Sequence, residues 1–350
     1  MPDFIDAATL LHLRDGGMPL LDARSPAEFL HGHIPGALNL PVLSDEERAI
    51  VGTAHARSGP EGAVHVALEL IGPQLASKLG RARSLTPRRH EVLLHCWRGG
   101  MRSRALAWLL ETGGYTVHVL EGGYRAYRRH VRAAFSRPQR ICILGGMTGC
   151  GKTDILQQLA ARGCQVIDLE GLANHRGSAF GGVGMGEQPT NEQVENALHA
   201  QWACLDPARP VWLEDESRRV GTVTLCGEFF QRMEAAPLVL VELPLEARVD
   251  RLVRMYAETT PDGPQVQALV DAFARIRERL GSEKCARCQE AVRCGDYASA
   301  VRLSLAYYDK AYTWQLARRQ RAIVHRVRLL RDDPAAAARM LAEAESSLPS

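Results

Sequence analysis

The chain has 350 residues, of which 46% are hydrophobic and 24% charged, and this is enough apolar material for two domains of ordinary size. The 43 basic residues nearly balance the 40 acidic ones, so the net charge of +3 does not by itself predict a nucleic-acid partner. The sequence has no run of about 18 apolar residues and its start does not resemble a signal peptide, which predicts a cytoplasmic protein with no membrane segment.

Arginine and cysteine usage narrows the expectations further. Only four basic residues are lysines, and the others are arginines; the lysines are Lys78, Lys152, Lys284 and Lys310. Codon composition explains the excess of arginine at least as simply as phosphate binding does. The nine cysteines are an odd number, scattered from Cys96 to Cys294, which predicts reduced thiols rather than a disulfide framework.

The first 135 residues alternate short apolar runs with helical stretches. The runs at 19–23, 37–40, 91–96 and 116–120 predict buried strands. Such alternation predicts a parallel sheet covered by helices, and we assign residues 1–135 to a first domain. Six arginines between positions 125 and 140 predict a linker that ends this domain.

A second alternation begins at residue 141. It predicts strands at 141–145, 165–169, 211–214 and 238–243, with helices from about 153, at 192–204 and near 225–235. We therefore assign residues 136–264 to a doubly wound α/β domain. From residue 265 onward alanine, leucine, arginine and glutamate recur at helical spacing, which predicts a helical C-terminal region over 265–350 without strands.

A cysteine ends the third predicted strand, where the chain enters a glycine-rich loop, His95-Cys96-Trp97-Arg98-Gly99-Gly100-Met101-Arg102-Ser103. Gly99 and Gly100 allow the backbone to curl so that several N–H groups point inward at the start of a helix, which favours an anion. This setting lowers the pKa of a thiol and favours a nucleophilic thiolate at Cys96. Arg98 and Arg102 add cationic donors, so we predict an anion site with Cys96 as the catalytic residue. An inert buried cysteine is the simpler alternative.

The sequence around this loop resembles the rhodanese family. The matching segments are Leu21-Asp22-Ala23-Arg24-Ser25-Pro26-Ala27-Glu28-Phe29, His33-Ile34-Pro35-Gly36-Ala37, the Cys96 loop and Glu121-Gly122-Gly123-Tyr124. The resemblance implies that Cys96 carries a chalcogen as a persulfide or perselenide. Many single-domain sulfurtransferases place an arginine five positions after the cysteine, whereas Arg102 lies six after Cys96. The longer loop has the spacing of cysteine-dependent phosphatases, which predicts a tetrahedral phosphorus-containing anion as the donor.

A phosphate-binding loop follows the predicted strand at 141–145. Its sequence Gly146-Met-Thr-Gly149-Cys-Gly151-Lys152-Thr153 fits the pattern G-x-x-x-x-G-K-T. The glycines free N–H groups to surround a diphosphate, Lys152 reaches its outer oxygens, and Thr153 can ligate Mg²⁺. In a chain that prefers arginine, a lysine here agrees with the need for a compact charge.

Two further segments are candidates for the same site. The apolar run before Glu214-Asp215-Glu216 resembles the acidic strand end of such domains; we assign Asp215 to Mg²⁺, with Glu216 as an alternative and a solvated strand end as the simpler explanation. The glycine-rich segment Asp168 to Gly181 contains three candidate substrate-loop residues, His175, Arg176 and Ser178. Solvated polar residues explain that loop equally well.

Two residue clusters have simpler structural explanations. The first lies at helical spacing and predicts a solvated helix face: Arg248, Arg251 and Arg254. The second lacks an evident fourth zinc ligand, so we predict ordinary helix cysteines and no structural metal: Cys285, Cys288 and Cys294.

The order of the two sites resembles the tRNA 2-selenouridine synthase family. The resemblance runs from Asp22 to the segment Tyr307-Tyr308-Asp309-Lys310-Ala311-Tyr312, and His175-Arg176-Gly177-Ser178 is its most specific motif. It implies a transferase that acts on the wobble 2-thiouridine of tRNA. In that family the sulfur receives a geranyl group from geranyl diphosphate, and selenium from selenophosphate then replaces the S-geranyl group. Both compounds would be co-substrates, with Mg²⁺ possible and a separate enzyme supplying selenophosphate.

A tRNA partner gives the arginine clusters a role in contacting the phosphate backbone. The clusters are Arg81, Arg83, Arg88 and Arg89; the 125–140 segment; and Arg318, Arg319, Arg321, Arg326, Arg328 and Arg331. Trp97 could stack on an extruded base or simply pack. The alternatives to this function are a phosphatase or small-molecule kinase, and a sulfur-carrier rhodanese fused to a kinase or nucleotide sensor.

Overall fold

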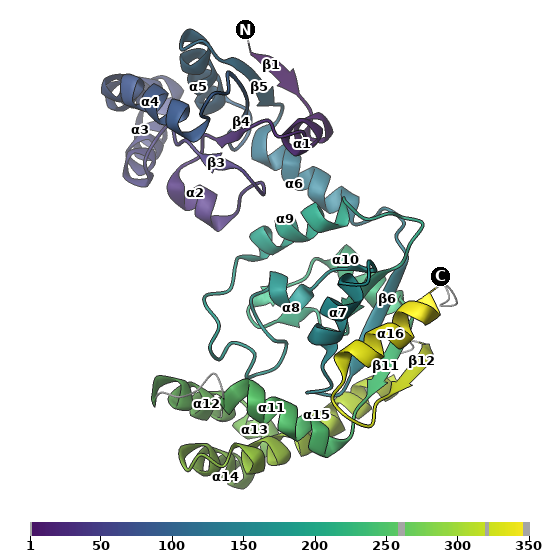
Figure 1. Cartoon of the computed structure of the whole chain (residues 1–350). Helices are drawn as coiled ribbons and strands as arrows, with labels where there is room; N and C mark the ends of the chain where they lie inside the picture. Colours follow the sequence, from purple (N-terminus) through teal and green to yellow (C-terminus); the bar gives the residue numbers. More distant parts are fainter. Residues whose placement is uncertain (1, 258–262, 319–321, 346–350) are drawn as a thin grey trace. The chain divides into compact units, whose positions relative to one another are not determined.

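The structure is a computed structural model that describes residues 2–257, 263–318 and 322–345 (Figure 1). The chain forms two compact units. The first contains Met1–Phe135 together with Glu195–Ala200, and the second contains Ser136–Val194 and Gln201–Ser350. The assignment of residues 1–135, 136–264 and 265–350 to separate domains stays a prediction.

The first unit contains a five-stranded parallel sheet in the order β1-β5-β4-β2-β3. The strands are β1 (Asp3–Ile5), β2 (Leu20–Asp22), β3 (Leu38–Asn39), β4 (Glu91–His95) and β5 (Thr116–Leu120). The four predicted strands are confirmed. Strand β1 was missed because it is three residues long and largely exposed at the sheet edge, so it has no apolar periodicity.

Helices surround this sheet: α1 (Ala7–Asp15), α2 (Pro26–His31), α3 (Asp45–Ile71), α4 (Leu75–Leu85), α5 (Met101–Thr112) and α6 (Gly123–Ala134), with a short 3₁₀ helix at Gly72–Gln74. Strand residues such as Leu94 and Val119 are fully buried against α5 residues such as Leu106 and Leu110. The predicted linker from residue 125 was wrong in its first part, because those residues belong to α6.

The second unit contains another five-stranded parallel sheet, in the order β12-β11-β6-β8-β7. Its strands are β6 (Ile141–Gly146), β7 (Gln165–Val166), β8 (Val211–Glu214), β11 (Leu238–Glu242) and β12 (Ile323–Arg328). A hairpin of β9 (Arg219–Val220) and β10 (Val223–Thr224) stands apart from this sheet. The central strand β6 is buried throughout, which fits its uninterrupted apolar sequence.

The helices of this unit are α7 (Lys152–Ala160), α8 (Leu169–Leu172), α9 (Asn191–Trp202, shared with the first unit), α10 (Gly227–Ala235), α11 (Leu245–Ala257), α12 (Gly263–Arg275), α13 (Arg277–Leu280), α14 (Ser282–Arg293), α15 (Tyr297–Arg318) and α16 (Pro334–Ala344). The α/β class with a mainly helical C-terminal region is confirmed. The prediction that strands end before residue 265 was wrong for β12, which pairs with β11 although alternate arginines interrupt its apolar pattern. Within the described residues, the helices are too short or too polar to cross a membrane.

Candidate active sites

Cys96 lies directly after β4, at the carboxyl end of the first sheet, and only 3% of it is exposed. Its Sγ donates to the Ser103 Oγ at 3.2 Å, and that hydroxyl donates to the Gly100 carbonyl at 3.0 Å. Ser103 is in the first turn of α5, so the thiol points toward the amino end of this helix. A thiolate at Cys96 would therefore accept a hydrogen bond from Ser103 and lie at the positive end of the helix dipole.

The Glu121-Gly122-Gly123-Tyr124 motif packs behind the cysteine loop. The N–H groups of Tyr124 and Arg125 donate to the carbonyls of Cys96 and Trp97, at 2.8 and 3.1 Å. Gly123 has φ +60°, and a Cβ there would lie 2.5 Å from the Gly99 nitrogen and also overlap the Cys96 carbonyl. The backbone of Gly123 therefore supports the loop at a distance that only glycine permits.

Gly123→Ala should displace the Cys96 loop. The added methyl group would overlap backbone atoms of the Cys96 loop, and alanine disfavours the positive φ of position 123. We therefore expect a loss of about 1–3 kcal/mol of stability and a larger loss of any Cys96-dependent activity. Thermal unfolding and the rate of Cys96 alkylation would measure both effects. The matched control is Gly80→Ala in α4, where nothing lies within 4 Å of the new Cβ. Equal behaviour of the two variants would contradict this account.

Arg102 is engaged by a carboxylate. Its Nη1 and Nη2 donate to Glu28 at 2.5 and 3.3 Å, and Arg48 also pairs with Glu28 at 3.2 Å. Burial acts to raise the pKa of Glu28, but the contacts with Arg102 hold it below its ordinary value. An anion in the loop would compete with Glu28 for Arg102. Arg98, within the loop, is exposed, and the anion-binding roles of both arginines stay predictions.

A buried polar network, which no local sequence pattern predicted, lies behind the loop. Asp22 and Arg24 are fully buried and form an ion pair with Nη2···Oδ2 2.6 Å, and the Arg24 guanidinium stacks 3.8 Å from the Tyr124 ring centroid. His95 Nε2 lies 3.5 Å from the same carboxylate. Burial acts to raise the pKa of Asp22, but its contacts with His95 and Arg24 hold it lower. The network joins the end of β2 to the residue before Cys96.

Asp22→Asn should destabilise the first unit by about 3–5 kcal/mol, because it leaves the Arg24 guanidinium buried without its counter-ion. The pKa of Asp22 is lowered in the folded state, so its contribution is present above the ordinary carboxyl pKa and is lost as the pH falls through the folded value. Denaturant unfolding at neutral pH measures the effect. Asp15→Asn removes an exposed partner of Arg14 and should change stability by less than about 1 kcal/mol. Similar losses in both variants would refute the role of the buried pair.

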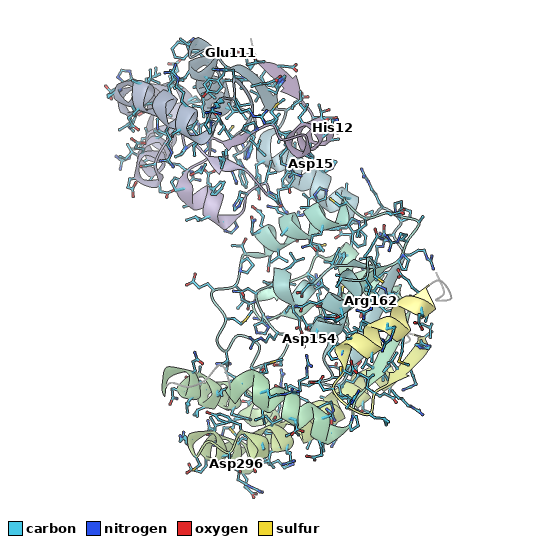
Figure 2. The ribbon with its side chains drawn as sticks, viewed as in Figure 1. His12, Asp15, Glu111, Asp154, Arg162 and Asp296 are labelled. Atoms are coloured by element: carbon cyan, nitrogen blue, oxygen red, sulfur yellow. The ribbon has the colours of Figure 1, made fainter. Side chains whose placement is uncertain are left out.

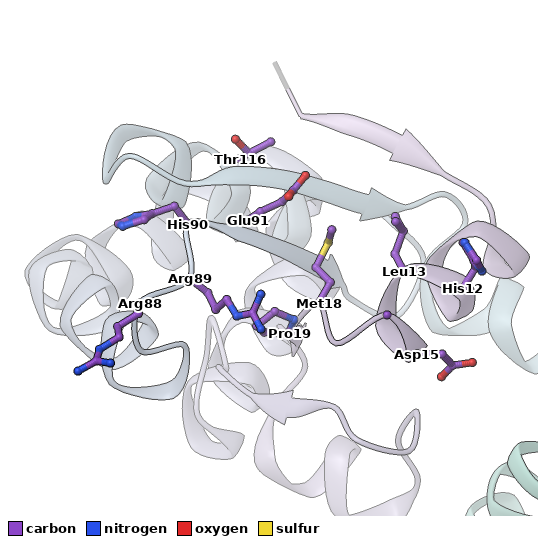
Figure 3. A pocket seen from close by; sticks show the side chains of 11 residues that line it. His12, Leu13, Asp15, Met18, Pro19, Arg88, Arg89, His90, Glu91 and Thr116 are labelled. Atoms are coloured by element: carbon purple, nitrogen blue, oxygen red, sulfur yellow. The ribbon is translucent and has the colours of Figure 1, made fainter.

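One cavity of the first unit is separate from Cys96. It measures about 790 Å³ and is lined by residues at the amino ends of the strands, including Pro19, Glu91 and Thr116 (Figure 3). Arg88 and Arg89 contribute to its wall. Because Cys96 follows the carboxyl end of β4, this cavity is at the opposite end of the sheet from the thiol.

The phosphate-binding loop joins β6 to α7 at the centre of the second sheet. Gly149 and Gly151 have φ values of +82° and +83°, and Gly151 caps α7 at its amino end. A Cβ on Gly146 would lie 2.5 Å from Cys150 Sγ and 2.7 Å from the Val241 carbonyl, so this strand-to-loop turn also requires glycine. The structure confirms the strand, glycine loop and helix on which the predicted diphosphate site depends.

Two carboxyl groups lie beside Lys152 and Thr153: that of Glu170, which was not predicted as a site residue, and that of Glu216, the alternative Mg²⁺ candidate. The Thr153 hydroxyl donates to Glu170 Oε2 at 3.0 Å. A Cβ on Gly177 would lie 2.7 Å from Glu170 and 2.6 Å from Glu216, which places these two carboxyl groups side by side. Burial and Glu170 raise the pKa of Glu216 to about 8. Burial acts to lower the pKa of Lys152, but nearby acidic groups raise it, so its ammonium stays charged.

Asp215, our Mg²⁺ candidate, follows β8 and lies near the phosphate loop. Its Oδ2 accepts from the Tyr312 hydroxyl at 3.2 Å, and the same hydroxyl accepts from the Gly146 N–H at 2.9 Å. Glu214 is fully buried and accepts from the Leu169 N–H at 2.9 Å, which explains it as a structural residue. Tyr312 comes from α15, far along the chain, so no local pattern could have shown that it contacts this loop.

The prediction of a solvated face at Arg248, Arg251 and Arg254 was wrong for the first two. Arg248 is 4% exposed; it donates to the Thr148 carbonyl at 3.2 Å and pairs with Asp309 of α15 at 2.7 Å. Arg251 pairs with Asp332 at 2.7 Å and with Asp154 of α7, which is labelled in Figure 2. These arginines hold α11 against the phosphate loop.

The glycine-rich loop folds back on itself beside this site. The Arg176 N–H donates to the Gly181 carbonyl at 3.1 Å, and the Phe180 N–H donates to Ser178 Oγ at 3.2 Å. The His175 N–H donates to the Glu170 carbonyl at 3.0 Å, and burial lowers the pKa of the His175 side chain, which favours its neutral form. The loop therefore lies close to Glu170, while substrate contacts by His175, Arg176 and Ser178 stay predictions.

The three C-terminal cysteines belong to or adjoin α14. Cys285 and Cys288 are buried, and their thiols point to the carbonyls of Phe273 and Ala300, at 3.4 and 3.8 Å. Cys294 is exposed at the end of this helix. Across the described part of the chain, no three His, Cys, Asp or Glu side chains are grouped as a metal-binding set.

Comparisons with known proteins cover both sites. Residues 139–345 match the family model described as the tRNA 2-selenouridine synthase AAA domain, and residues 6–130 match the rhodanese-like domain. The tRNA 2-selenouridine synthase of Nitrosomonas europaea is 35% identical over 86% of this chain and 79% of its own length. Those of Hydrogenovibrio crunogenus and Cronobacter sakazakii are 36% and 35% identical, over 87% and 93% of this chain and 90% and 93% of their own lengths.

Proposed function

This chain belongs to the tRNA 2-selenouridine synthase family of tRNA-modifying transferases, and we propose that it converts wobble 2-thiouridine to 2-selenouridine through an S-geranyl intermediate. The observation that carries the proposal is the presence in one chain of two different glycine-rich loops, each joining a strand to the start of a helix. One contains the Cys96 thiol, and the other has the sequence pattern of a diphosphate-binding loop.

The phosphate-binding loop would hold geranyl diphosphate. The thiouridine sulfur attacks the first carbon of the geranyl chain, the carbon–oxygen bond breaks, and diphosphate leaves with the bonding electrons while N3 of the base loses its proton. Lys152 stays charged in its acidic surroundings, and the free N–H groups at the start of α7 add positive potential. Both stabilise the negative charge that develops on the leaving group.

The residues around the loop fit Mg²⁺. Thr153 and Asp215 supply hydroxyl and carboxylate oxygens, which are the ligands that this hard cation prefers, and bound Mg²⁺ commonly takes its remaining ligands from phosphate and water. When bound, it would neutralise charge on the diphosphate. Thr153 would exchange its hydrogen bond to Glu170, and Asp215 its contact with Tyr312, for this role.

The Cys96 loop would act on selenophosphate, delivered by a separate selenophosphate-supplying enzyme. Direct transfer of selenium to the Cys96 sulfur, as a perselenide, leaves the bonding electron pair on phosphorus and so releases phosphite; release of phosphate by this route would require a further two-electron acceptor. Attack of the Cys96 thiolate on phosphorus balances without one. The sulfur–phosphorus bond forms, the phosphorus–selenium bond breaks, and hydrogen selenide leaves with the electron pair.

Hydrogen selenide then completes the exchange. Its selenium attacks C2 of the S-geranyl base, the C2–sulfur bond breaks, geranyl thiolate leaves and takes a proton from water, and the selenide proton moves to N3. Water hydrolyses the phosphocysteine. Selenide is a weakly basic leaving group, so the attack of Cys96 on phosphorus needs no protein acid to protonate it. This fits a phosphatase-like loop that has no evident general acid beside it. The Ser103 hydroxyl, 3.2 Å from Cys96 Sγ, would stabilise the thiolate before attack and as a leaving group.

The tRNA backbone would be held by exposed arginines. Arg81, Arg83, Arg88, Arg89, Arg125 and Arg129 are exposed in the first unit. Arg128 is excluded, because it is buried and pairs with Glu195. Arg326 and Arg328 both pair with Glu242, and Arg319 and Arg321 lie outside the described residues.

Affinity for 2-thiouridine tRNA should fall by about tenfold or more between about 50 and 200 mM salt. The double substitution Arg125→Gln and Arg129→Gln should weaken binding and reduce the slope of log affinity against log salt. Each lost phosphate contact lowers the number of counterions that are released when the tRNA binds. Fluorescence anisotropy with labelled tRNA measures both. Arg293→Gln on α14, outside these clusters, should leave the slope unchanged. A salt-independent affinity of the unaltered protein would refute backbone contact by these arginines.

The full reaction is tested by incubating the protein with 2-thiouridine tRNA, geranyl diphosphate, selenophosphate and Mg²⁺. Mass spectrometry of the nucleosides should show S-geranyl-2-thiouridine when selenophosphate is omitted and 2-selenouridine when it is added. Absence of both products refutes the proposal. 2-Selenouridine formed without geranyl diphosphate refutes only the geranyl step.

A further inference from the structure

A narrow apolar cavity of about 40 Å³ lies in the helical part of the second unit. Its wall contains no charged side chain and has five aromatic rings. The lining residues outside the loops come from α11, α12, α14 and α15, and the aromatic ones are Phe180, Tyr256, Phe273, Tyr297 and Tyr308. An apolar cavity of this kind binds hydrocarbon rather than a nucleotide base or sugar, whose polar groups would find few partners there.

The cavity adjoins the phosphate-binding loop. Thr148 of that loop forms part of the cavity wall. The next residue, Gly149, packs on Leu252 of the wall so closely that a Cβ there would lie 3.0 Å from the leucine side chain. Arg248 reinforces this connection, because it donates both to the Thr148 carbonyl and to Asp309 of α15. The apolar wall of the cavity and the phosphate-binding loop are therefore in direct contact.

The glycine-rich loop reaches the same cavity. Ser178 and Phe180 line it, and the Phe180 ring makes edge contacts with Phe273 and Tyr256, with centroid distances of 4.7 and 6.3 Å. This explains why the segment after His175 combines small residues with one buried aromatic: the backbone turns tightly beside Glu170, and Phe180 closes the cavity.

We infer that this cavity binds the isoprenoid chain of the allylic diphosphate whose diphosphate lies in the loop at Gly146–Thr153, an inference that rests on the proposed geranyl transfer. The chain would enter past Thr148, with its first carbon near the mouth. The aromatic rings of the wall favour the positive charge that develops as the carbon–oxygen bond breaks. Because the cavity is narrow, the chain occupies it only as wall side chains rotate, which favours short isoprenoids over long ones.

A variant that fills the cavity separates binding of the chain from binding of the diphosphate. Ala300 of α15 is 2% exposed and lines the cavity, so Ala300→Phe places a ring in it. Isothermal titration with Mg²⁺ present compares geranyl diphosphate with inorganic diphosphate. We expect about tenfold or greater weakening for geranyl diphosphate and a change of less than about twofold for inorganic diphosphate. Ala306→Phe, the same substitution at an exposed position of the same helix, should affect neither.

A second variant covers the case in which Ala300→Phe loses inorganic diphosphate binding and is therefore misfolded. Tyr297→Ala removes a half-buried wall residue and enlarges the cavity. We expect the affinity for farnesyl diphosphate to rise by about fivefold or more relative to geranyl diphosphate. If the folded variants keep the wild-type affinity ratios among the three ligands, the cavity assignment is wrong. If the wild-type protein binds geranyl diphosphate no better than inorganic diphosphate and forms no S-geranyl product, the proposed function itself fails.

Discussion

Cys96→Ser should abolish formation of 2-selenouridine while S-geranyl-2-thiouridine still forms and accumulates. A serine hydroxyl has a much higher pKa than a thiol, so the positive end of α5 and the Ser103 hydroxyl do not convert it to a useful nucleophile. Loss of a covalent nucleophile lowers turnover by at least about 1,000-fold. Nucleoside mass spectrometry in the complete reaction measures both products.

The nature of the Cys96 adduct distinguishes two chemical roles for this residue. Attack on phosphorus predicts a phosphocysteine, which acid quenching of a reaction with phosphorus-labelled selenophosphate would trap. A perselenide would carry selenium and no label. Cys204→Ser, at an exposed thiol, is the control and should keep full activity. Retained selenation in Cys96→Ser would show that this thiol is not the nucleophile.

Lys152→Ala should lower the rate of S-geranylation by about 100- to 1,000-fold, the usual effect of removing one charged donor from a developing anion. Lys152 is the first residue of α7, directly after Gly151 of the phosphate loop, and its ammonium stays charged beside Glu170 and Glu216. Selenation of tRNA that already carries the S-geranyl group should continue, since that step uses Cys96. The measurement is single-turnover formation of each nucleoside.

Lys284→Ala provides the matched control, because Lys284 is exposed on α14. Circular dichroism of Lys152→Ala should match that of the unaltered protein, which separates a catalytic defect from misfolding. If a folded Lys152→Ala protein still geranylates tRNA at the rate of the unaltered protein, the diphosphate does not bind in this loop. A defect in both steps would instead indicate that the two activities are coupled.

The sequence showed the features that depend on neighbouring residues. Strands such as β4 and β6 are continuous apolar runs in buried parallel sheets, and both active loops follow a strand and precede a helix. Their glycines are needed for local backbone geometry, as at Gly99, Gly149 and Gly151. Strand β12 was missed because exposed arginines alternate along it and interrupt its apolar pattern. It forms a strand because it pairs with β11, which lies about 85 residues away in the chain.

Sequence motifs alone predict the two loops, their residue types and the family, because such motifs record local geometry and chemistry. Which distant groups act on those loops depends on how the chain folds. Tyr312 and Glu170 reach the phosphate loop, Glu28 holds Arg102, and Arg248 joins the loop to Asp309 of α15. These contacts join residues that lie between 17 and 166 positions apart, and no local pattern encodes them, because they exist only after the chain has packed.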